Sequence, residues 1–162
     1  FMPDVMAADD AFLDKALEGM SRFELDEPAG MIYCPFHGLL HLPTWADRRR
    51  TFERVAASLR PDGCFAWHAL AFGFRVASRS HGLHQDAPTP HVTNFSVASN
   101  RIDIVRDDSA TSSMWWATLN EWLGLLDVAG LELESLNSGF SAEPLEDDST
   151  QYVFVARLRS EA

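Results

Sequence analysis

The chain has 162 residues, of which 46% are apolar and 11% aromatic, a composition that fits one folded domain and excludes a disordered or collagen-like chain. The 13 Lys and Arg residues stand against 24 Asp and Glu, which gives a net charge of −11. That charge argues against nucleic acid or an anionic membrane as a partner, because both require a basic face. No signal peptide and no apolar stretch near the ~20 residues that cross a bilayer are visible, so we expect a cytoplasmic protein in which Cys34 and Cys64 are free thiols.

The first 72 residues are expected to form a helix and then a strand–helix–strand unit. Apolar residues at helical spacing predict an amino-terminal helix within residues 1–18, which Gly19 should end. Residues 29–36 are an apolar run flanked by prolines, which is typical of a central strand in a parallel sheet. Residues 64–72 are a second run of this kind. Residues 19–72 therefore predict a right-handed crossover between two parallel strands.

The segment between these two strands carries the clearest helix pattern. Thr44 with Asp47 three residues later resembles a capping box in which Asp replaces Glu. Pro61-Asp62-Gly63 contains turn residues that should stop the helix. One stripe of the helix is apolar and should face the core, whereas the opposite stripe is charged and should face solvent. The apolar stripe consists of Trp45, Phe52, Val55, Ala56 and Leu59, and the charged stripe consists of Arg48, Arg49, Glu53 and Arg60.

The remaining residues are expected to form a loop, an antiparallel insertion and a carboxyl-terminal hairpin. Residues 73–91 hold three histidines and two prolines and predict a loop or lid. Residues 92–118 predict antiparallel strands, with the first turn at Ser99-Asn100. Residues 119–158 predict a helix and then two strands joined by an acidic loop. This order of helices and strands predicts one α/β domain.

Four segments resemble, in the same order, passages of class I S-adenosylmethionine-dependent methyltransferases. AGMIYCPFHGLLHL resembles the family's fourth strand and the loop after it, and LRPDGCFAWHALAF resembles the turn into its fifth strand. NEWLGLLDVAGLELESL and TQYVFVARL resemble the last helix and the final hairpin. The resemblance spans residues 19–158 and implies a partial Rossmann-like methyltransferase sheet with an antiparallel insertion. It also implies S-adenosylmethionine as cofactor and a small molecule as substrate.

Two features of the family have no counterpart in this chain. The glycine-rich loop that approaches the cofactor closely is absent, because the nine glycines occur singly, and no acidic residue matches the one that binds the ribose. The chain therefore resembles the carboxyl-terminal half of such a protein. We expect this chain by itself to bind S-adenosylmethionine weakly or not at all, with any dissociation constant weaker than about 10 μM. A half-sheet leaves a central strand at an edge, so we also expect a homo-oligomer.

The resemblance implies a cofactor site at the carboxyl ends of the parallel strands, where ligands bind in doubly wound sheets. Met20 and Ser21 would lie near the adenine. The methionine portion would pass Cys34, Pro35 and Phe36. For Cys34 and Phe36 the alternative is that the side chain simply belongs to the core.

Histidines and aromatic residues are the other candidates for chemistry. His37 directly follows the first strand and is a candidate general base, because histidine titrates near neutral pH. His68, Phe72 and Trp116 are candidates for the substrate pocket, although His68 also suits a hydrogen-bonded core position. His37 and His41 lie four residues apart and could hold zinc, but neither a cysteine pair nor an HExxH pattern supports that alternative, and we expect no metal.

Two functions from different classes remain open at this point. The first is methyl transfer from S-adenosylmethionine to a small-molecule acceptor. The second is a catalytically inactive, methyltransferase-like module that self-associates or acts as a scaffold. The absent glycine-rich loop favours the second for this chain alone, whereas the rest of the resemblance favours the first.

Overall fold

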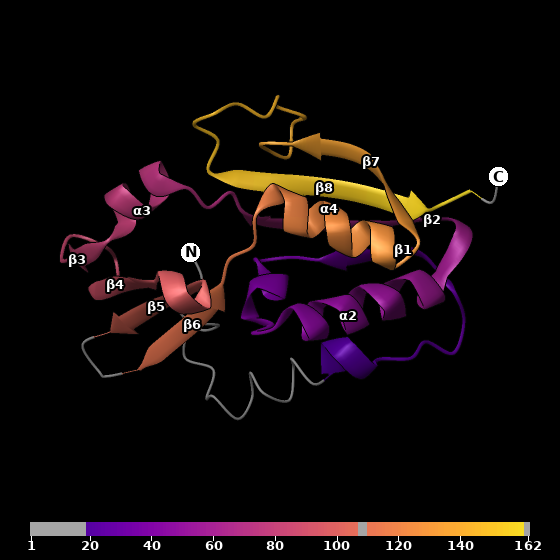
Figure 1. Ribbon diagram of the computed structural model, residues 1–162, viewed down its shortest axis with the longest axis horizontal. Helices are drawn as coiled ribbons and strands as arrows, with labels where there is room; N and C mark the ends of the chain where they lie inside the picture. The colour runs from indigo at the N-terminus through magenta and orange to yellow at the C-terminus, as the bar shows by residue number, and fades with distance from the viewer. Residues whose placement is uncertain (1–18, 107–109, 161–162) are drawn as a thin grey trace.

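Two four-stranded sheets make up the computed structural model, which describes residues 19–106 and 110–160 (Figure 1). The main sheet has the order β1-β2-β8-β7, with β1 Ala29–Cys34, β2 Leu59–Leu70, β7 Leu131–Asn137 and β8 Gln151–Leu158. The second sheet has the order β3-β4-β5-β6, with β3 Gly82–His84, β4 His91–Ser96, β5 Arg101–Arg106 and β6 Thr111–Trp115. The predicted α/β fold with an antiparallel insertion and a carboxyl-terminal hairpin is confirmed.

The strand–helix–strand unit has the predicted topology. β1 and β2 are parallel, with Cys34 paired to Trp67, and α2 (Trp45–Ser58) is the crossover between them. A turn was predicted at Pro61-Asp62-Gly63, but residues 60–63 instead form a bulge inside β2, where the register of its pairing with β1 shifts. Gly63 is required there because a Cβ atom would lie 2.8 Å from the carbonyl oxygen of Ala29.

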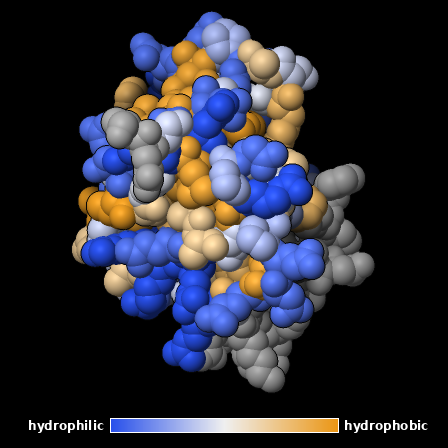
Figure 2. Space-filling model, turned by 90° about the vertical axis from the view of Figure 1, so that its right-hand side faces the viewer, coloured by the Kyte–Doolittle hydropathy of each residue, from blue (hydrophilic) through white to orange (hydrophobic). Residues whose placement is uncertain are grey.

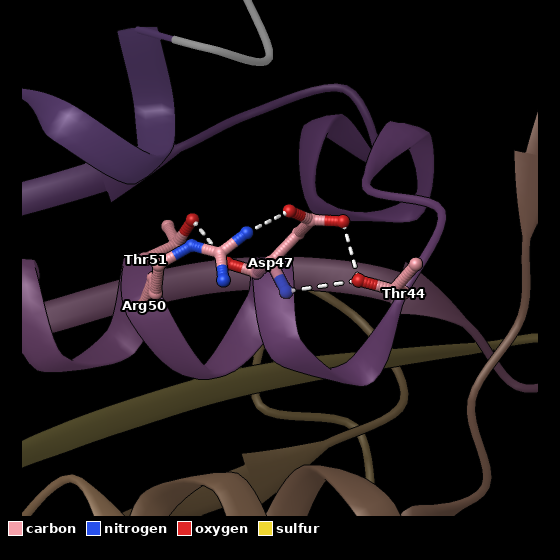
Figure 3. A network of polar contacts seen from close by, with 4 residues as sticks. All are labelled: Thr44, Asp47, Arg50 and Thr51. Carbon is pink, nitrogen blue, oxygen red and sulfur yellow. Dashed lines mark hydrogen bonds and ion pairs between the residues drawn. The ribbon is translucent and has the colours of Figure 1, made fainter.

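The start of α2 is fixed by the predicted cap (Figure 3). Thr44 Oγ1 accepts a hydrogen bond from the backbone N–H of Asp47 at 3.1 Å. The Asp47 carboxylate accepts from the Thr44 hydroxyl and pairs with Arg50, while Thr51 Oγ1 donates to the Asp47 carbonyl oxygen at 3.0 Å. Such a cap satisfies backbone donors that the first helical turn leaves open, and it contributes about 1 kcal/mol.

Two helices cover one face of the main sheet and form the core with it (Figure 1). α4 (Leu119–Val128) begins at a capping box between Thr118 and Glu121 and packs beside α2. Aromatic rings fill the space between the helices and the sheet: the Trp67 ring stacks on Phe154 at 4.5 Å and meets Phe52 at 5.2 Å. Burial of this apolar layer supplies most of the stabilisation.

The opposite face of the main sheet is less covered in the described residues. Met31 and Tyr33 project from β1 with exposed fractions of 59% and 48%. β1 is also an edge strand of the main sheet. At the end of the molecule where the C-terminus lies, apolar side chains show at the surface between charged ones (Figure 2).

The segment predicted as a loop, residues 73–91, is instead partly regular. It contains α3 (Phe74–Ser80) and β3, which pairs with β4. A seven-residue helix and a three-residue strand are too short to show periodicity, so the prediction rested on the prolines and histidines, which indicated a loop. The turn between β4 and β5 is confirmed, with Asn100 in the left-handed region at φ 50°. The insertion ends at Trp115, three residues earlier than predicted.

The helix predicted within residues 1–18 lies outside the described residues. Gly19 was predicted to end a helix, but residues 19–22 are themselves helical, so this prediction is wrong. Gly19 has no atom near its Cβ position, and a helix tolerates glycine at a cost of about 1 kcal/mol.

Arg48 was predicted to face solvent, but it is 5% exposed. Its guanidinium donates to the carbonyl oxygens of Trp115 and Leu39, the second at 3.4 Å, and lies 5.2 Å from the Trp122 ring centre. Burial lowers the Arg48 pKa to about 10, an effect that Glu121 partly opposes. Arg48 thus joins α2 to β6 and connects the two sheets. Trp45, predicted to be buried, is exposed.

We predict that Arg48→Ala lowers the free energy of unfolding by about 2–4 kcal/mol, because two carbonyl oxygens lose their donor and the side chain leaves a void. Urea denaturation measures the change. The matched control is Arg49→Ala, which removes a surface ion pair with Glu53 and an exposed contact with the Trp45 ring at 5.9 Å, and should cost under about 1 kcal/mol. Equal losses for the two variants would contradict the role given to Arg48.

Candidate functional site

The carboxyl ends of β1 and β2 lie at the same edge of the main sheet because the two strands are parallel. This edge faces α3 and the second sheet, on the left in Figure 1. β8 runs antiparallel to β2, so its first residues and the loop before it reach the same edge. In open α/β sheets ligands bind at this edge, which makes it the candidate site.

An unusual backbone turn follows β1. Phe36 and His37 both adopt the left-handed region, at φ 57° and 58°, before the short helix η1 (Gly38–His41). Non-glycine residues in this region cost on the order of 1–2 kcal/mol each, and such strain clusters at functional sites. Gly38 allows the close return of the chain, because a Cβ atom there would lie 2.9 Å from Cys34 Sγ. The turn leaves the Phe36 ring 56% exposed at the edge.

His37, from the turn after β1, and His68, from β2, meet at this edge. Their ring centres are 4.5 Å apart in an edge-to-face arrangement, and the Phe140 ring lies 5.2 Å from that of His68. His68 is only 8% exposed. The Nδ1 atoms of both histidines are buried and have no hydrogen-bond partner among the described residues. Buried polar atoms are normally paired, so these two nitrogens are unusual, as are the unpartnered indole nitrogens of Trp67 and Trp122 in the core.

The protonation of these groups follows from burial. Burial, together with smaller effects of the neighbouring His68 and His41, lowers the pKa of His37 from 6.5 to about 4. Burial also lowers the pKa of His68. Burial raises the pKa of the Cys34 thiol, against a hydrogen bond from the Leu39 backbone. At pH 7 the edge therefore presents a neutral His37 imidazole and an intact thiol, with no fixed charge from these groups.

His41 has a structural contact. Its Nδ1 lies 3.1 Å from the Ser113 carbonyl oxygen, a contact that joins η1 to β6. Residues 19–106 and 110–160 contain no group of three or more His, Cys, Asp or Glu side chains that could hold a metal ion.

The residues predicted for the substrate separate into two clusters. Phe72 stacks on Trp116 with ring centres 3.9 Å apart, and Phe95 lies beside both rings. Trp116 is buried, so it packs behind Phe72. His68 does not join these rings but belongs with His37. Cys34, Pro35 and Phe36 lie together at the end of β1 as predicted.

The residues predicted near the adenine lie on the helical turn at 19–22. Met20 packs against the hydrophobic core with a partly buried side chain, and Ser21 follows it. The structure thus gives Met20 a contact with the core.

A cavity of about 440 Å³ lies at the same edge, between α3 and residues 145–150. Sequence reasoning missed most of its lining, because charged residues from distant segments form its walls. The sequence did contain a signal for this cavity, namely charged residues of both signs near predicted strand ends. These residues are Arg75 and Arg79 after β2, and Glu146, Asp147 and Asp148 before β8.

Several solved structures of methyltransferases are similar to this chain in fold. An S-adenosylmethionine-dependent methyltransferase from Clostridium acetobutylicum matches 87% of the chain with a TM-score of 0.71 and 12% identity. The CcbJ methyltransferase from Streptomyces caelestis matches 93% with a TM-score of 0.71 and 15% identity. CalS10, an amino pentose methyltransferase from Micromonospora echinaspora solved with S-adenosylmethionine, matches 92% with a TM-score of 0.57 and 16% identity. The chain therefore has the class I S-adenosylmethionine-dependent methyltransferase fold.

The chain spans 63% of the Clostridium protein and 70% of the other two. No family model matches the sequence. Acetaldehyde dehydrogenase 2 from Cupriavidus necator is 46% identical over 59 residues, which are 35% of this chain and 11% of that protein. So short a match does not extend to a fold or an activity. No helix of the described residues is long and apolar enough to span a membrane.

We predict that the His37 imidazole titrates near pH 4 and not near 6.5. The unfolded chain takes up this proton at higher pH than the folded one, so His37 makes stability fall as pH drops from 6.5 to about 4. A ¹H–¹³C NMR titration of the ring measures the pKa, and His37→Gln should flatten this part of the stability profile. A midpoint at 6.5 or above would contradict the buried, neutral imidazole.

Proposed function

We propose that this chain forms the acceptor-side half of an S-adenosylmethionine-dependent methyltransferase that acts on a small molecule in the cytoplasm. The observation that carries the proposal is the pair of unpartnered imidazole nitrogens at the carboxyl ends of β1 and β2. The fold shared with methyltransferases supports the same assignment. Free Cys34 and Cys64 suit a reducing compartment.

The edge of the sheet fits the cofactor in part. The exposed Phe36 ring and the turn through Cys34 and Pro35 offer an apolar surface, and the neutral imidazoles do not repel a cation. Met20 and Ser21 would flank the adenine. The cofactor supplies an electrophilic methyl group on a sulfonium sulfur.

His37 is the proposed general base. Its ring is neutral at pH 7 but, with a pKa of about 4, is a weaker base than the near-neutral histidine expected from the sequence. Its unpartnered nitrogen would accept the proton that the acceptor atom loses as it gains the methyl group. His68 would orient the acceptor through its own free nitrogen. Phe72, backed by Trp116, would provide the apolar wall on which the acceptor rests. Holding the two reactants in line would provide most of the rate enhancement, because such positioning lowers the activation free energy by about 7–11 kcal/mol at best.

A second candidate, an inactive and self-associating module, rests on the exposed apolar face of β1. Met31 and Tyr33 leave this face open at an edge strand in the described residues. Two copies that cover each other here would form the expected homo-oligomer. We predict a dimer by light scattering at micromolar concentration, which Met31→Glu should convert to a monomer. A wild-type monomer at this concentration would contradict self-association.

Titration of the ¹⁵N-labelled protein with S-adenosylmethionine tests the proposed function. We predict saturable shifts at residues 34–38 and at His68, with a dissociation constant weaker than about 10 μM because half of the cofactor contacts are absent. Phe36→Ala should weaken binding several-fold, whereas Leu83→Ala, an exposed apolar residue of β3, should not. ATP shares the adenosine but lacks the sulfonium and serves as the matched ligand. The absence of shifts at residues 34–38 at 5 mM cofactor (roughly 3 kcal/mol of binding) would overturn the proposal.

A ¹³C-methyl label separates the two candidates. With small amines, alcohols and carboxylic acids as acceptors, methyl transfer gives a new ¹³C-methyl resonance, and His37→Gln should slow its appearance about 100-fold. Cofactor binding without any new resonance would favour the inactive module.

A further inference from the structure

The cavity beside α3 combines an apolar floor with charged walls. Leu70, Phe72 and Tyr152 belong to its floor, and the Ala71 N–H donates to the Thr150 carbonyl oxygen at 3.0 Å, which holds the loop against β2. Its volume of about 440 Å³ lies in the range of small-molecule sites. The cavity can therefore enclose a ligand of modest size with an apolar body.

The two walls carry opposite charges. Arg75 and Arg79 lie one turn apart on α3, so both are on the same side of the helix. Residues 146–148, an acidic run, approach from the loop before β8. None of these five side chains forms an ion pair with another described residue, and the Arg75 guanidinium lies 5.9 Å from the centre of the Phe74 ring. Both signs of charge thus stay available to a ligand.

Tyr152 adds a polar group to the floor. Burial raises its pKa, so the hydroxyl stays protonated at neutral pH. It has no hydrogen-bond partner among the described residues and can donate to a ligand inside the cavity.

We propose that this cavity binds a small zwitterion, a molecule that carries an ammonium and a carboxylate on an apolar body. The ammonium would lie among the carboxylates of residues 146–148, the ligand carboxylate against Arg75 and Arg79, and the body on Phe72 and Leu70. The acidic loop repels a ligand that carries only a negative charge, and the arginines repel a ligand that carries only a positive charge. The two walls together therefore favour a ligand that carries both charges. The claim that the zwitterion is the methyl acceptor rests on the proposed function. The claim that the cavity binds a zwitterion does not.

Three probes of matched shape test the inference: phenylalanine, phenethylamine and 3-phenylpropionate. In NMR titrations without cofactor, phenylalanine should shift residues 70–80 and 145–152. It should bind about tenfold more tightly than either singly charged probe, because each loses one set of charged contacts. Equal affinity for all three, or no shifts in these segments at 20 mM phenylalanine (roughly 2 kcal/mol of binding), would overturn the zwitterion site.

Charge-removing variants assign each wall. Arg79→Gln should weaken phenylalanine and 3-phenylpropionate about tenfold and leave phenethylamine unchanged. Asp147→Asn combined with Asp148→Asn should weaken phenylalanine and phenethylamine and spare 3-phenylpropionate. The controls are Arg49→Gln on α2 and Asp62→Asn in the β2 bulge, both exposed, which should change nothing. Variants that weaken all three probes alike would show a general packing effect and contradict the assignment.

The cofactor and zwitterion sites are observed through different residues, so their failures are distinguishable. Phenylalanine shifts without cofactor shifts at 34–38 would leave the zwitterion site standing and overturn the methyltransferase assignment. Cofactor shifts without phenylalanine shifts would do the reverse.

Discussion

The parallel pairing of β1 and β2 is the constraint on which the rest of the structure depends. Two parallel neighbours need a crossover, and α2 supplies it on the helical face of the sheet. Their carboxyl ends then share one edge, where His37 follows the first strand and His68 lies near the end of the second. The antiparallel β7–β8 hairpin returns Phe140 and the acidic loop to this edge.

Two kinds of electrostatic environment lie along that edge. Near β1, burial keeps His37 neutral and leaves two ring nitrogens without partners. Near α3, charges of both signs surround an apolar floor at the surface. Neither His37 nor His68 lines the charged cavity, so the two environments are distinct places along the same edge. Arg48 holds α2 against β6 and so keeps the second sheet beside this edge.

Local patterns predicted the fold well where they were strong. Apolar runs located β1 and β2, Thr44 with Asp47 located the start of α2, and the resemblance indicated a methyltransferase-like sheet. The prediction for Arg48 was wrong because helical periodicity assigns arginine to the solvent-facing side of a helix. The burial of Arg48 depends instead on carbonyl oxygens of η1 and β6, which lie outside the helix. The cavity was missed for the same reason, since its two walls lie about seventy residues apart and only the sheet topology brings them together. His37 could be picked out from its position after a strand, but its contact with His68 could not.

The ¹⁵N resonances of the histidine side chains test most directly whether the carboxyl edge of β1 and β2 is a ligand site. On addition of S-adenosylhomocysteine, the Nδ1 resonances of His37 and His68 should move. Those of His84 and His91 should not, because the rings of these two stack on each other in the second sheet and each bonds a backbone carbonyl oxygen. Unmoved His37 and His68 resonances, or equal shifts at all four histidines, would contradict a site built on the parallel strands.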